Sequence, residues 1–376
     1  MVKPAFRPFP GVVSGADRFH IICDGRHLLD FSGSAMTTGY NFIRQDWLEP
    51  IVSRLLFQND YTSELKKTLT GISGFNNIAF STSGTEACDT ALSRFGKPFI
   101  GLEGAYHGLT FLTRIVSNGT GYDEENKIIH LKCPFPEVSI EQARDYNNEI
   151  LNNIPVKLEG GTMIMELIQS DGGVNVLPAD FVKELFEIAR KYGIHTIVDE
   201  VYTGYGRSGE LFLYKKYGIK PDIVCIGKGM AAGLPLGAVL YNNDWDLPFN
   251  DVVSMQAGNM FVSRVALEVL KTLDEKRLSA VRKNGRDIIN KLLSVKNDKI
   301  HSVKGRGYMV GVEFRDDNDN PDGKYALKIR DKLFAEGLVC SLTGASNNVL
   351  KITPPVLIDE ENLNSGISIL VDALEK

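Results

Sequence analysis

Between about residues 70 and 240, short apolar runs alternate with amphipathic stretches, and this alternation restricts the fold more than any other feature. Short runs rich in Val, Ile and Leu are typical of buried strands, and the amphipathic stretches between them are typical of covering helices. The sequence therefore predicts an α/β protein whose large domain contains a mostly parallel sheet covered by helices. The expected strands are residues 77–81, 98–102, 162–168, 196–201, 222–226 and 237–241.

Two segments have the apolar spacing of long helices. Apolar residues recur every three or four positions over residues 180–192, and this stretch ends at Gly193. Glycine is favoured immediately after the C-terminus of a helix. Residues 259–293 have the same spacing, so we expect both segments to be mostly helical.

Beyond residue 293 the pattern changes to that of a smaller α+β unit. It predicts an alternating strand, a helix, a second strand and a final helix over residues 301–314, 324–336, 349–353 and 360–374. Near the N-terminus, two apolar runs flank Asp24-Gly25, a pair typical of two-residue hairpin turns. We expect this hairpin to pack with the smaller unit. The expected division is an N-terminal segment, a large domain and a small C-terminal domain over residues 1–45, 46–275 and 276–376.

Charge and composition exclude several classes of protein. The 376 residues carry a net charge of −5 and no basic cluster, which argues against nucleic-acid or anionic-membrane partners. No apolar stretch approaches the roughly 20 residues that span a bilayer, and the first ten residues lack the apolar core of a secretion signal. The five cysteines form no Cys-x-x-Cys pair and His-Glu-x-x-His is absent, so neither disulfides nor a metal site is expected. The sequence predicts a cytoplasmic protein.

Three of the expected strands lead to charged residues. One leads to Lys228, another to Asp199 and a third to Glu166. Open α/β sheets bind ligands at the carboxyl ends of their strands, and a desolvated lysine there is a nucleophile. Taken singly, a lysine beside glycines more often belongs to a loop, and acids at strand ends are more often caps or surface charges. Together, a lysine that forms an imine and a carboxylate that holds a ring nitrogen are what pyridoxal phosphate requires.

Two more segments place phosphate-binding and aromatic groups near the same strand ends. Ser83, Gly84 and Thr85 stand at the start of an expected helix, where free backbone N–H groups and the helix dipole can bind a phosphate. The same residues could equally form a plain N-cap. Tyr106 and His107 follow another strand within a glycine-bounded turn, and the ring of Tyr106 can stack on a flat cofactor.

In this order, these residues resemble those of the class III pyridoxal-phosphate-dependent aminotransferases, which have fold type I. The resemblance extends from Phe19 to the C-terminus and is most specific over residues 199–209 and 227–237. It implies a large cofactor-binding domain, a smaller domain built from both termini, and a homodimer. It also implies that Lys228 binds pyridoxal 5'-phosphate as a Schiff base and that Asp199 pairs with the pyridinium nitrogen.

The resemblance implies further roles around the cofactor. Tyr106 and Val201 would lie on the two faces of its ring, and Gly84 and Thr85 would bind its phosphate. Tyr202 takes the place of the family's glutamine near the ring hydroxyl. The expected cofactor-binding set is Ser83, Gly84, Thr85, Tyr106, His107, Glu166, Asp199, Val201, Tyr202, Lys228 and, from the second subunit, Ser254 and Met255.

The chain departs from the family at positions that bear on the substrate. Leu109 and Lys351 stand where the family has two arginines that bind substrate carboxylates. Asp171 stands where the family has the glutamate that pairs with the second arginine. Met255 replaces a threonine that reaches the partner's phosphate, with Ser254 or Gln256 as a substitute. The resemblance therefore implies an intact cofactor site with altered substrate contacts, in which Leu109 favours apolar or uncharged groups.

These features predict an aminotransferase that moves an amino group from an ω-amino acid or amine, of the acetylornithine, ornithine or 4-aminobutyrate type, to a keto acid such as 2-oxoglutarate. An aminomutase or racemase of the same family would use the same lysine and aspartate. A nicotinamide-dependent oxidoreductase is a more distant alternative, because residues 204–209 match Gly-x-Gly-x-x-Gly. The crossover that follows this motif is too short for the helix of a dinucleotide-binding unit.

Overall fold

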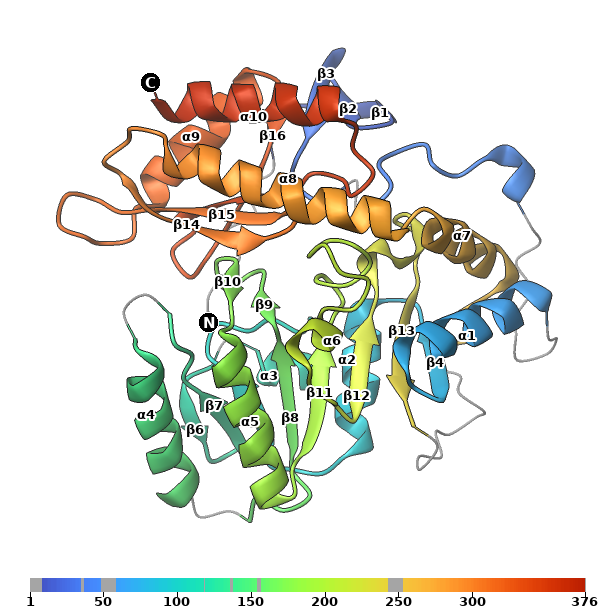
Figure 1. The fold of residues 1–376 in the computed structure, drawn as a ribbon, viewed down its shortest axis with the longest axis vertical. Helices are drawn as coiled ribbons and strands as arrows, with labels where there is room; N and C mark the ends of the chain where they lie inside the picture. Colours follow the sequence, from blue (N-terminus) through green and yellow to red (C-terminus); the bar gives the residue numbers. More distant parts are fainter. Residues whose placement is uncertain are drawn as a thin grey trace.

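An eight-stranded sheet forms the centre of the larger part of the molecule (Figure 1). The computed structural model describes residues 9–34, 37–48, 59–117, 119–135, 138–153, 157–242 and 253–375; residues 1–8, 35 and 36 of the expected N-terminal segment lie outside them. All strands but β13 and β6 run parallel to one another. In spatial order the strands are β4 (Asn77–Ser81), β13 (Gly237–Tyr241), β12 (Ile223–Ile226), β11 (His195–Asp199), β8 (Thr162–Glu166), β5 (Phe99–Leu102), β7 (Ile128–Leu131) and β6 (Gly121–Asp123).

Each apolar run expected to be a strand of the large domain forms one, but the direction of β13 was not predicted. β12 ends at Ile226 and β13 begins at Gly237, with only the short 3-10 helix η2 (Lys228–Ala231) between them. A parallel crossover needs a dozen or more residues, so the chain returns antiparallel. The sequence pattern also missed β6 and β7. The run over residues 162–168 is interrupted, because Ile168 begins the short hairpin of β9 (Ile168–Gln169) and β10 (Asn175–Val176).

Helices cover both faces of the large sheet, with α5 in front and α2 behind in Figure 1. α5 (Ala179–Tyr192) begins one residue before its predicted start and ends at Gly193, whose φ of 64° lets its amide bond the last carbonyls. None of the helices in these ranges is both long and apolar enough to cross a bilayer. The others in this part are α1 (Asp60–Ser73), α2 (Gly84–Arg94), α3 (Phe111–Ile115), α4 (Ile140–Asn153), α6 (Leu213–Tyr217), α7 (Met260–Lys271) and the 3-10 helix η1 (Gln45–Trp47).

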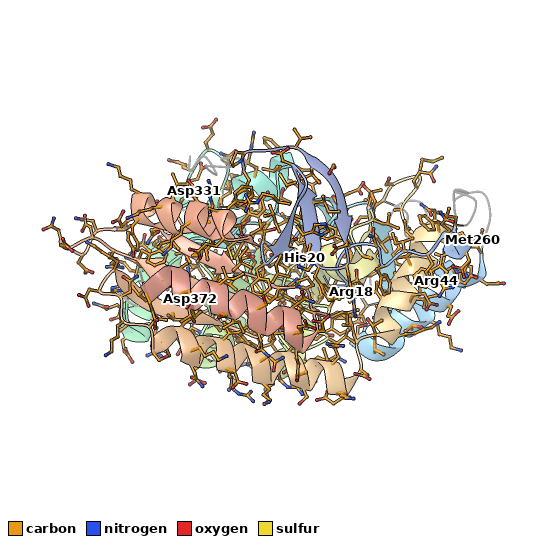
Figure 2. The ribbon with its side chains drawn as sticks, turned by 90° about the horizontal axis from the view of Figure 1, so that it is seen from above. Arg18, His20, Arg44, Met260, Asp331 and Asp372 are labelled. Atoms are coloured by element: carbon orange, nitrogen blue, oxygen red, sulfur yellow. The ribbon has the colours of Figure 1, made fainter. Side chains whose placement is uncertain are left out.

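A smaller α+β unit lies beyond the carboxyl ends of the parallel strands (Figure 1). Its sheet has the order β14 (Ile300–Arg306), β15 (Met309–Phe314), β18 (Val349–Ile352) and β17 (Ser341–Thr343). The single strand expected over residues 301–314 was wrong, because the chain turns at Gly307, which has a φ of 57°. Figure 2 shows the outer helices from above, with Asp331 on α9 and Asp372 on α10. These helices are α8 (Glu275–Leu293), α9 (Gly323–Ala335) and α10 (Glu360–Glu375).

Both ends of the chain contribute to this smaller unit, which confirms the expected fold class. β2 (His20–Cys23) and β3 (Arg26–Asp30) form a hairpin whose turn residues, Asp24 and Gly25, have φ angles of 48° and 75°. Two positive φ values are typical of the two-residue turn that Asp-Gly favours. β1 (Val13–Asp17) pairs with β2, and β3 pairs in parallel with β16 (Leu338–Val339). The N-terminal strands are thereby joined to the C-terminal part.

Candidate active site

Three neighbouring strands bring the charged residues predicted from the sequence to one edge of the sheet. Asp199 is the last residue of β11 and Glu166 the last residue of β8, and the two lie opposite each other in the strand register. Asp199 also lies opposite Cys225 of β12, and Lys228 follows the end of β12 by two residues. The arrowheads of these strands point towards the smaller unit in Figure 1. The carboxyl ends of parallel strands are where open α/β sheets bind ligands.

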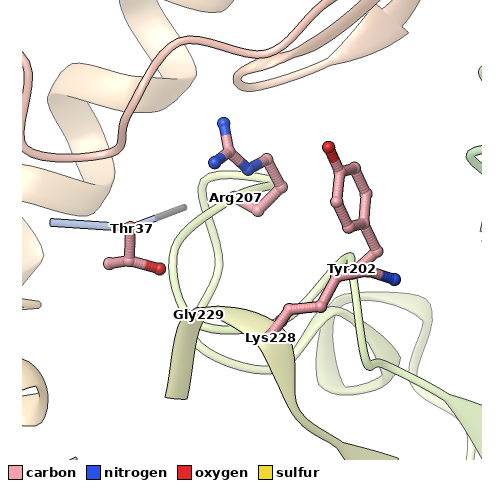
Figure 3. A pocket seen from close by; sticks show the side chains of 6 residues that line it. Thr37, Tyr202, Arg207, Lys228 and Gly229 are labelled. Carbon is pink, nitrogen blue, oxygen red and sulfur yellow. The ribbon is translucent and has the colours of Figure 1, made fainter. Parts of the chain in front are cut away.

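Lys228 stands at the start of η2 and points towards Tyr202. Its backbone φ is 41°, a left-handed conformation that is uncommon for a residue with a side chain. Its Nζ lies 4.5 Å from the centroid of the Tyr202 ring. Figure 3 shows Lys228 and Tyr202 on one side of a small pocket, with Thr37 and Arg207 on the other. The reactive-lysine candidate therefore faces a cavity rather than open solvent.

Asp199 is buried and accepts three hydrogen bonds. Only 5% of it is exposed. Its Oδ2 accepts hydrogen bonds from His107 Nδ1 at 2.9 Å and Cys88 Sγ at 3.4 Å, and its Oδ1 accepts one from the Val201 amide at 2.9 Å. Since a carboxylate only accepts, His107 carries its proton on Nδ1 in this pair. These donors stabilise a carboxylate in a place where an unpaired one would be costly.

Glu166 differs from Asp199 in its electrostatic surroundings. Its Oε2 accepts from the Tyr106 amide at 2.9 Å, and its Oε1 from the Ser170 amide at 3.4 Å. Burial, followed by the nearby charge of Asp199, raises the pKa of Glu166 well above its usual value. Two adjacent buried carboxyl groups do not both ionise readily, so the environment of Glu166 favours its neutral form. Its contact with the Tyr106 amide fixes the turn that carries Tyr106.

The start of α2 lies against the same strand ends. A Cβ on Gly84 would clash with Val201, and a Cβ on Gly227 would lie 3.1 Å from the Gly84 Cα. Ser83 is the N-cap, because its Oγ accepts from the Glu86 amide at 3.1 Å. The Gly84 and Thr85 amides precede the first intrahelical hydrogen bond, from Ala87 to Ser83. The Ser83 hydroxyl forms the cap, whereas the Gly84 and Thr85 amides are the groups that can bind a phosphate. The cap and the phosphate-site interpretations are therefore compatible.

Lys351 and Asp171 form an ion pair near the Tyr202 ring. Lys351 Nζ lies 3.1 Å from Asp171 Oδ1, 3.3 Å from Ser170 Oγ and 5.3 Å from the centroid of the Tyr202 ring. Partial desolvation favours the neutral form of Asp171, but Lys351 and Lys228 outweigh it and lower the pKa of this carboxyl. For Lys351, burial opposes the charge, while Tyr202 and Asp171 outweigh it and raise the pKa.

Some of the expected site residues lie apart from this pocket. Leu109 is 72% exposed and Met255 is 55% exposed, and neither lines the pocket at Lys228. Ser254 and Met255 belong to the turns that precede α7. The sequence analysis also missed two contributors, Thr37 and Cys88. Nothing local distinguishes them, because their proximity to the site arises only when distant segments pack together.

The glycine motif of residues 204–209 does not have the structure of a dinucleotide-binding loop. These residues form successive turns, and Gly206 and Gly209 have φ angles of 83° and 84°. The next helix, α6, has only five residues and starts four residues later. A dinucleotide-binding motif instead opens directly into a helix whose N-terminus binds the pyrophosphate. The motif therefore gives no support to the oxidoreductase alternative.

The sheet, the strand-end lysine and the buried aspartate define a pyridoxal-phosphate enzyme of fold type I. The Aminotransferase class-III family model matches residues 18–374, so this chain belongs to the class III aminotransferase family. It is a pyridoxal-phosphate-dependent aminotransferase, as the sequence predicted. The donors on Asp199 and the tight packing of Gly84, Val201 and Gly227 fit this cofactor.

Several characterised proteins are similar over almost the whole chain. The acetylornithine aminotransferase of Aquifex aeolicus is 30% identical, over 93% of this chain and 93% of the relative. The ornithine aminotransferase of Saccharomyces cerevisiae is 29% identical, over 98% and 94%. The alanine/serine racemase of Pyrococcus horikoshii is 29% identical, over 94% and 83%.

Solved structures confirm the fold. A Bacillus anthracis aminotransferase superposes with a TM-score of 0.85 at 22% identity, over 100% of this chain and 96% of that one. An amine transaminase from an uncultivated Pseudomonas species, in a form with pyridoxal phosphate bound, gives 0.85 at 24% identity over the same shares.

Proposed function

We propose that Lys228 binds the cofactor as a Schiff base and that Asp199 pairs with its ring nitrogen. The observation that supports this assignment is the position of the two side chains at the ends of neighbouring strands, with Asp199 buried under three donors. Ser83, Gly84 and Thr85 would hold the phosphate at the start of α2. Tyr106 and Val201 would lie against the two faces of the ring.

Pyridoxal phosphate, when bound, supplies an electron sink and a carrier for the amino group. Asp199 would keep a proton on the ring nitrogen, where a unit charge pair about 4 Å apart is worth up to about 4 kcal/mol at an effective dielectric of about 20. His107 and Cys88 hold the Asp199 carboxylate in place through Oδ2. Lys228, once its amine is free, is the base that would remove a proton from the substrate carbon and transfer it to a different atom.

The proposed donor is an ω-amino acid or amine, and the proposed acceptor is a keto acid such as 2-oxoglutarate. Relatives that act on acetylornithine and ornithine support this substrate class. Lys351 would contact a substrate carboxylate, with Asp171 as its partner when no carboxylate is bound. We retain the interpretation that Leu109 disfavours a carboxylate at the other end of the donor, although Leu109 is exposed in the single chain.

A panel of amino donors tests this proposal in the half-reaction. Purified cofactor-loaded protein is mixed with each donor without a keto acid, and the visible absorption of the lysine-bound cofactor is followed. We expect at least one ω-amino acid or amine to bleach this absorption and release the corresponding carbonyl product. If no donor does so while the cofactor stays bound, the proposed transamination is wrong.

Racemisation is the second candidate, favoured by the similarity to the alanine/serine racemase. Abstraction and return of a proton at one carbon would need the same Lys228 and Asp199, but no keto acid. Incubating L-alanine and L-serine with the enzyme and separating the enantiomers would decide between the two. Formation of the D-enantiomer without a keto acid supports racemisation, whereas products only in the presence of a keto acid support transamination.

We also propose that the protein is a cytoplasmic homodimer. Each chain would consist of three parts: residues 1–45, 46–275 and 276–376. The pairing of β3 with β16 supports the grouping of the first and last parts. Hydrogen exchange should protect these two strands together, and separate protection would contradict the division. Cell fractionation tests the location, and recovery in a membrane pellet would contradict it. Ser254 and Met255 would contact the partner's phosphate site.

A further inference from the structure

Three cationic side chains surround the ring of Tyr202. Besides Lys228 at 4.5 Å and Lys351 at 5.3 Å, the guanidinium carbon of Arg207 lies 5.9 Å from the ring centroid. Cations are attracted to the face of an aromatic ring. Tyr202 therefore lies close to both Lys228 and Lys351, the residue that we propose to contact a substrate carboxylate.

The Tyr202 hydroxyl lies beside the strand that carries Lys351. At Gly33, whose φ is +87°, a Cβ would clash with Tyr202 Oη and would lie 2.8 Å from Thr353 Oγ1. Thr353 Oγ1 and the Tyr202 hydroxyl both lie beside Gly33, and Lys351 is close enough to act on the charge of Tyr202, so Lys351 and Thr353 both face Tyr202. The phenol hydroxyl and the Lys351 ammonium are thereby brought to one place.

The charges at this place favour an anion. Burial favours the neutral phenol, but the charge of Lys351 and then that of Arg207 outweigh it and lower the pKa of Tyr202. Lys351 already binds a carboxylate in this structure, that of Asp171 at 3.1 Å. Asp171 thus shows that a carboxylate oxygen can reach this ammonium.

We propose that the Tyr202 hydroxyl and the Lys351 ammonium together form a two-donor site for a substrate carboxylate, which makes Tyr202 a specificity-determining residue. A lysine alone offers a point charge, whereas a guanidinium offers two donors in fixed directions. The ammonium of Lys351 has rotatable donors, so the hydroxyl supplies the second donor in a fixed direction that a guanidinium would provide. The ligand class is an amino acid or keto acid with a free carboxylate, and this inference rests on the proposed function.

Tyr202→Phe tests the hydroxyl alone, because it keeps the ring and its contacts with the cations. A hydrogen bond to a charged group is worth enough that KM for carboxylate substrates should rise by about 10- to 100-fold. The ratio kcat/KM should fall at least about tenfold more for carboxylate substrates than for a donor without a carboxylate, such as a simple arylalkylamine. Succinate binding to the cofactor-loaded protein, measured by calorimetry, should weaken by the same factor as KM.

Tyr205→Phe is the matched control. Tyr205 is only 1% exposed, and its hydroxyl has no hydrogen-bond partner within the described ranges. Removing this hydroxyl should leave both KM and succinate affinity unchanged. Adding Lys351→Arg to Tyr202→Phe should restore part of the lost affinity, because the guanidinium brings two donors of its own.

Unchanged succinate affinity and unchanged KM in Tyr202→Phe would overturn the two-donor site and leave Tyr202 as packing. Equal losses for the amine and the carboxylate substrates would also overturn it, since the effect would then not depend on the carboxylate. A failure of the proposed transamination is distinct, because wild type would then convert no donor. Succinate calorimetry does not depend on turnover and would still test the site.

Discussion

Lys228, whose side chain we propose to bind the cofactor, also has an unusual backbone conformation. A left-handed conformation, here with φ at 41°, costs a residue with a Cβ about 1–2 kcal/mol. Such a conformation persists where the surrounding structure fixes it, which happens often at functional sites. Packing of Gly227 against Gly84 is one contact that fixes this turn.

Lys228→Ala is expected to abolish turnover and the visible absorption of the lysine-bound cofactor. The fold should remain, because the left-handed conformation costs alanine about as much as it costs lysine. The far-ultraviolet circular dichroism should therefore not change. Lys220→Ala is the control, since Lys220 is an exposed lysine at the opposite end of β12. A Lys228→Ala protein with normal activity and an unchanged spectrum would contradict the assignment.

Asp199→Ala should still bind the cofactor but lose most of its rate. The charge pair of up to about 4 kcal/mol corresponds to a loss of up to about a thousandfold in kcat. Asp199→Glu should retain more activity, because the carboxylate is kept at a shifted position. Steady-state kinetics at saturating cofactor make the comparison, and equal rates for wild type and Asp199→Ala would refute the role.

At the scale of elements, the first amides of α6 donate hydrogen bonds to the carboxylate of Glu200, the residue after Asp199. Glu200 is 1% exposed and accepts from the Leu213 amide at 2.9 Å and the Tyr214 amide at 2.6 Å. Burial raises its pKa from 4.5 to about 7, although these amides oppose the rise. Glu200 therefore supports the start of a helix, while its neighbour Asp199 faces the site.

The raised pKa of Glu200 predicts a pH dependence of stability. Between pH 4.5 and about 7 the folded chain holds this proton and the unfolded chain does not. The free energy of unfolding should therefore fall as the pH rises through this window, by up to about 3 kcal/mol. Glu200→Gln should remove this part of the slope in urea unfolding between about pH 5 and about pH 8. Glu187→Gln, at an exposed position of α5, should leave the slope unchanged.

The sequence predicted the elements whose signals are local. The runs that became β12 and β11 are continuous and apolar, and the glycine after α5 marks its end. The direction of β13, the hydroxyl and thiol contributed by Thr37 and Cys88, and the exposure of Leu109 were not predicted. Each of these depends on how distant segments pack, which no window of sequence contains.

At the scale of the whole molecule, the single chain leaves several large apolar side chains in solvent. Leu109, Phe111 and Met255 are 72%, 66% and 55% exposed. Single exposed apolar side chains are common on proteins, so their exposure indicates a partner only where a second observation points to one. Leu109 and Met255 are also positions that the family resemblance places at the substrate and at the partner's phosphate.

The protein should therefore be a homodimer in which Met255 contacts the partner, and Met255→Glu should disturb both the dimer and the cofactor site. A glutamate there would bury a charge in the interface and face the partner's phosphate with a like charge. We expect wild type to sediment at twice the 41.6 kDa of the chain, and Met255→Glu to shift towards the monomer and bind the cofactor at least about tenfold more weakly. Leu293→Glu is the control, because Leu293 is 62% exposed at the end of α8, outside the implied contact. A wild-type monomer with full activity, or a Met255→Glu protein that keeps both dimer and cofactor, would refute this arrangement.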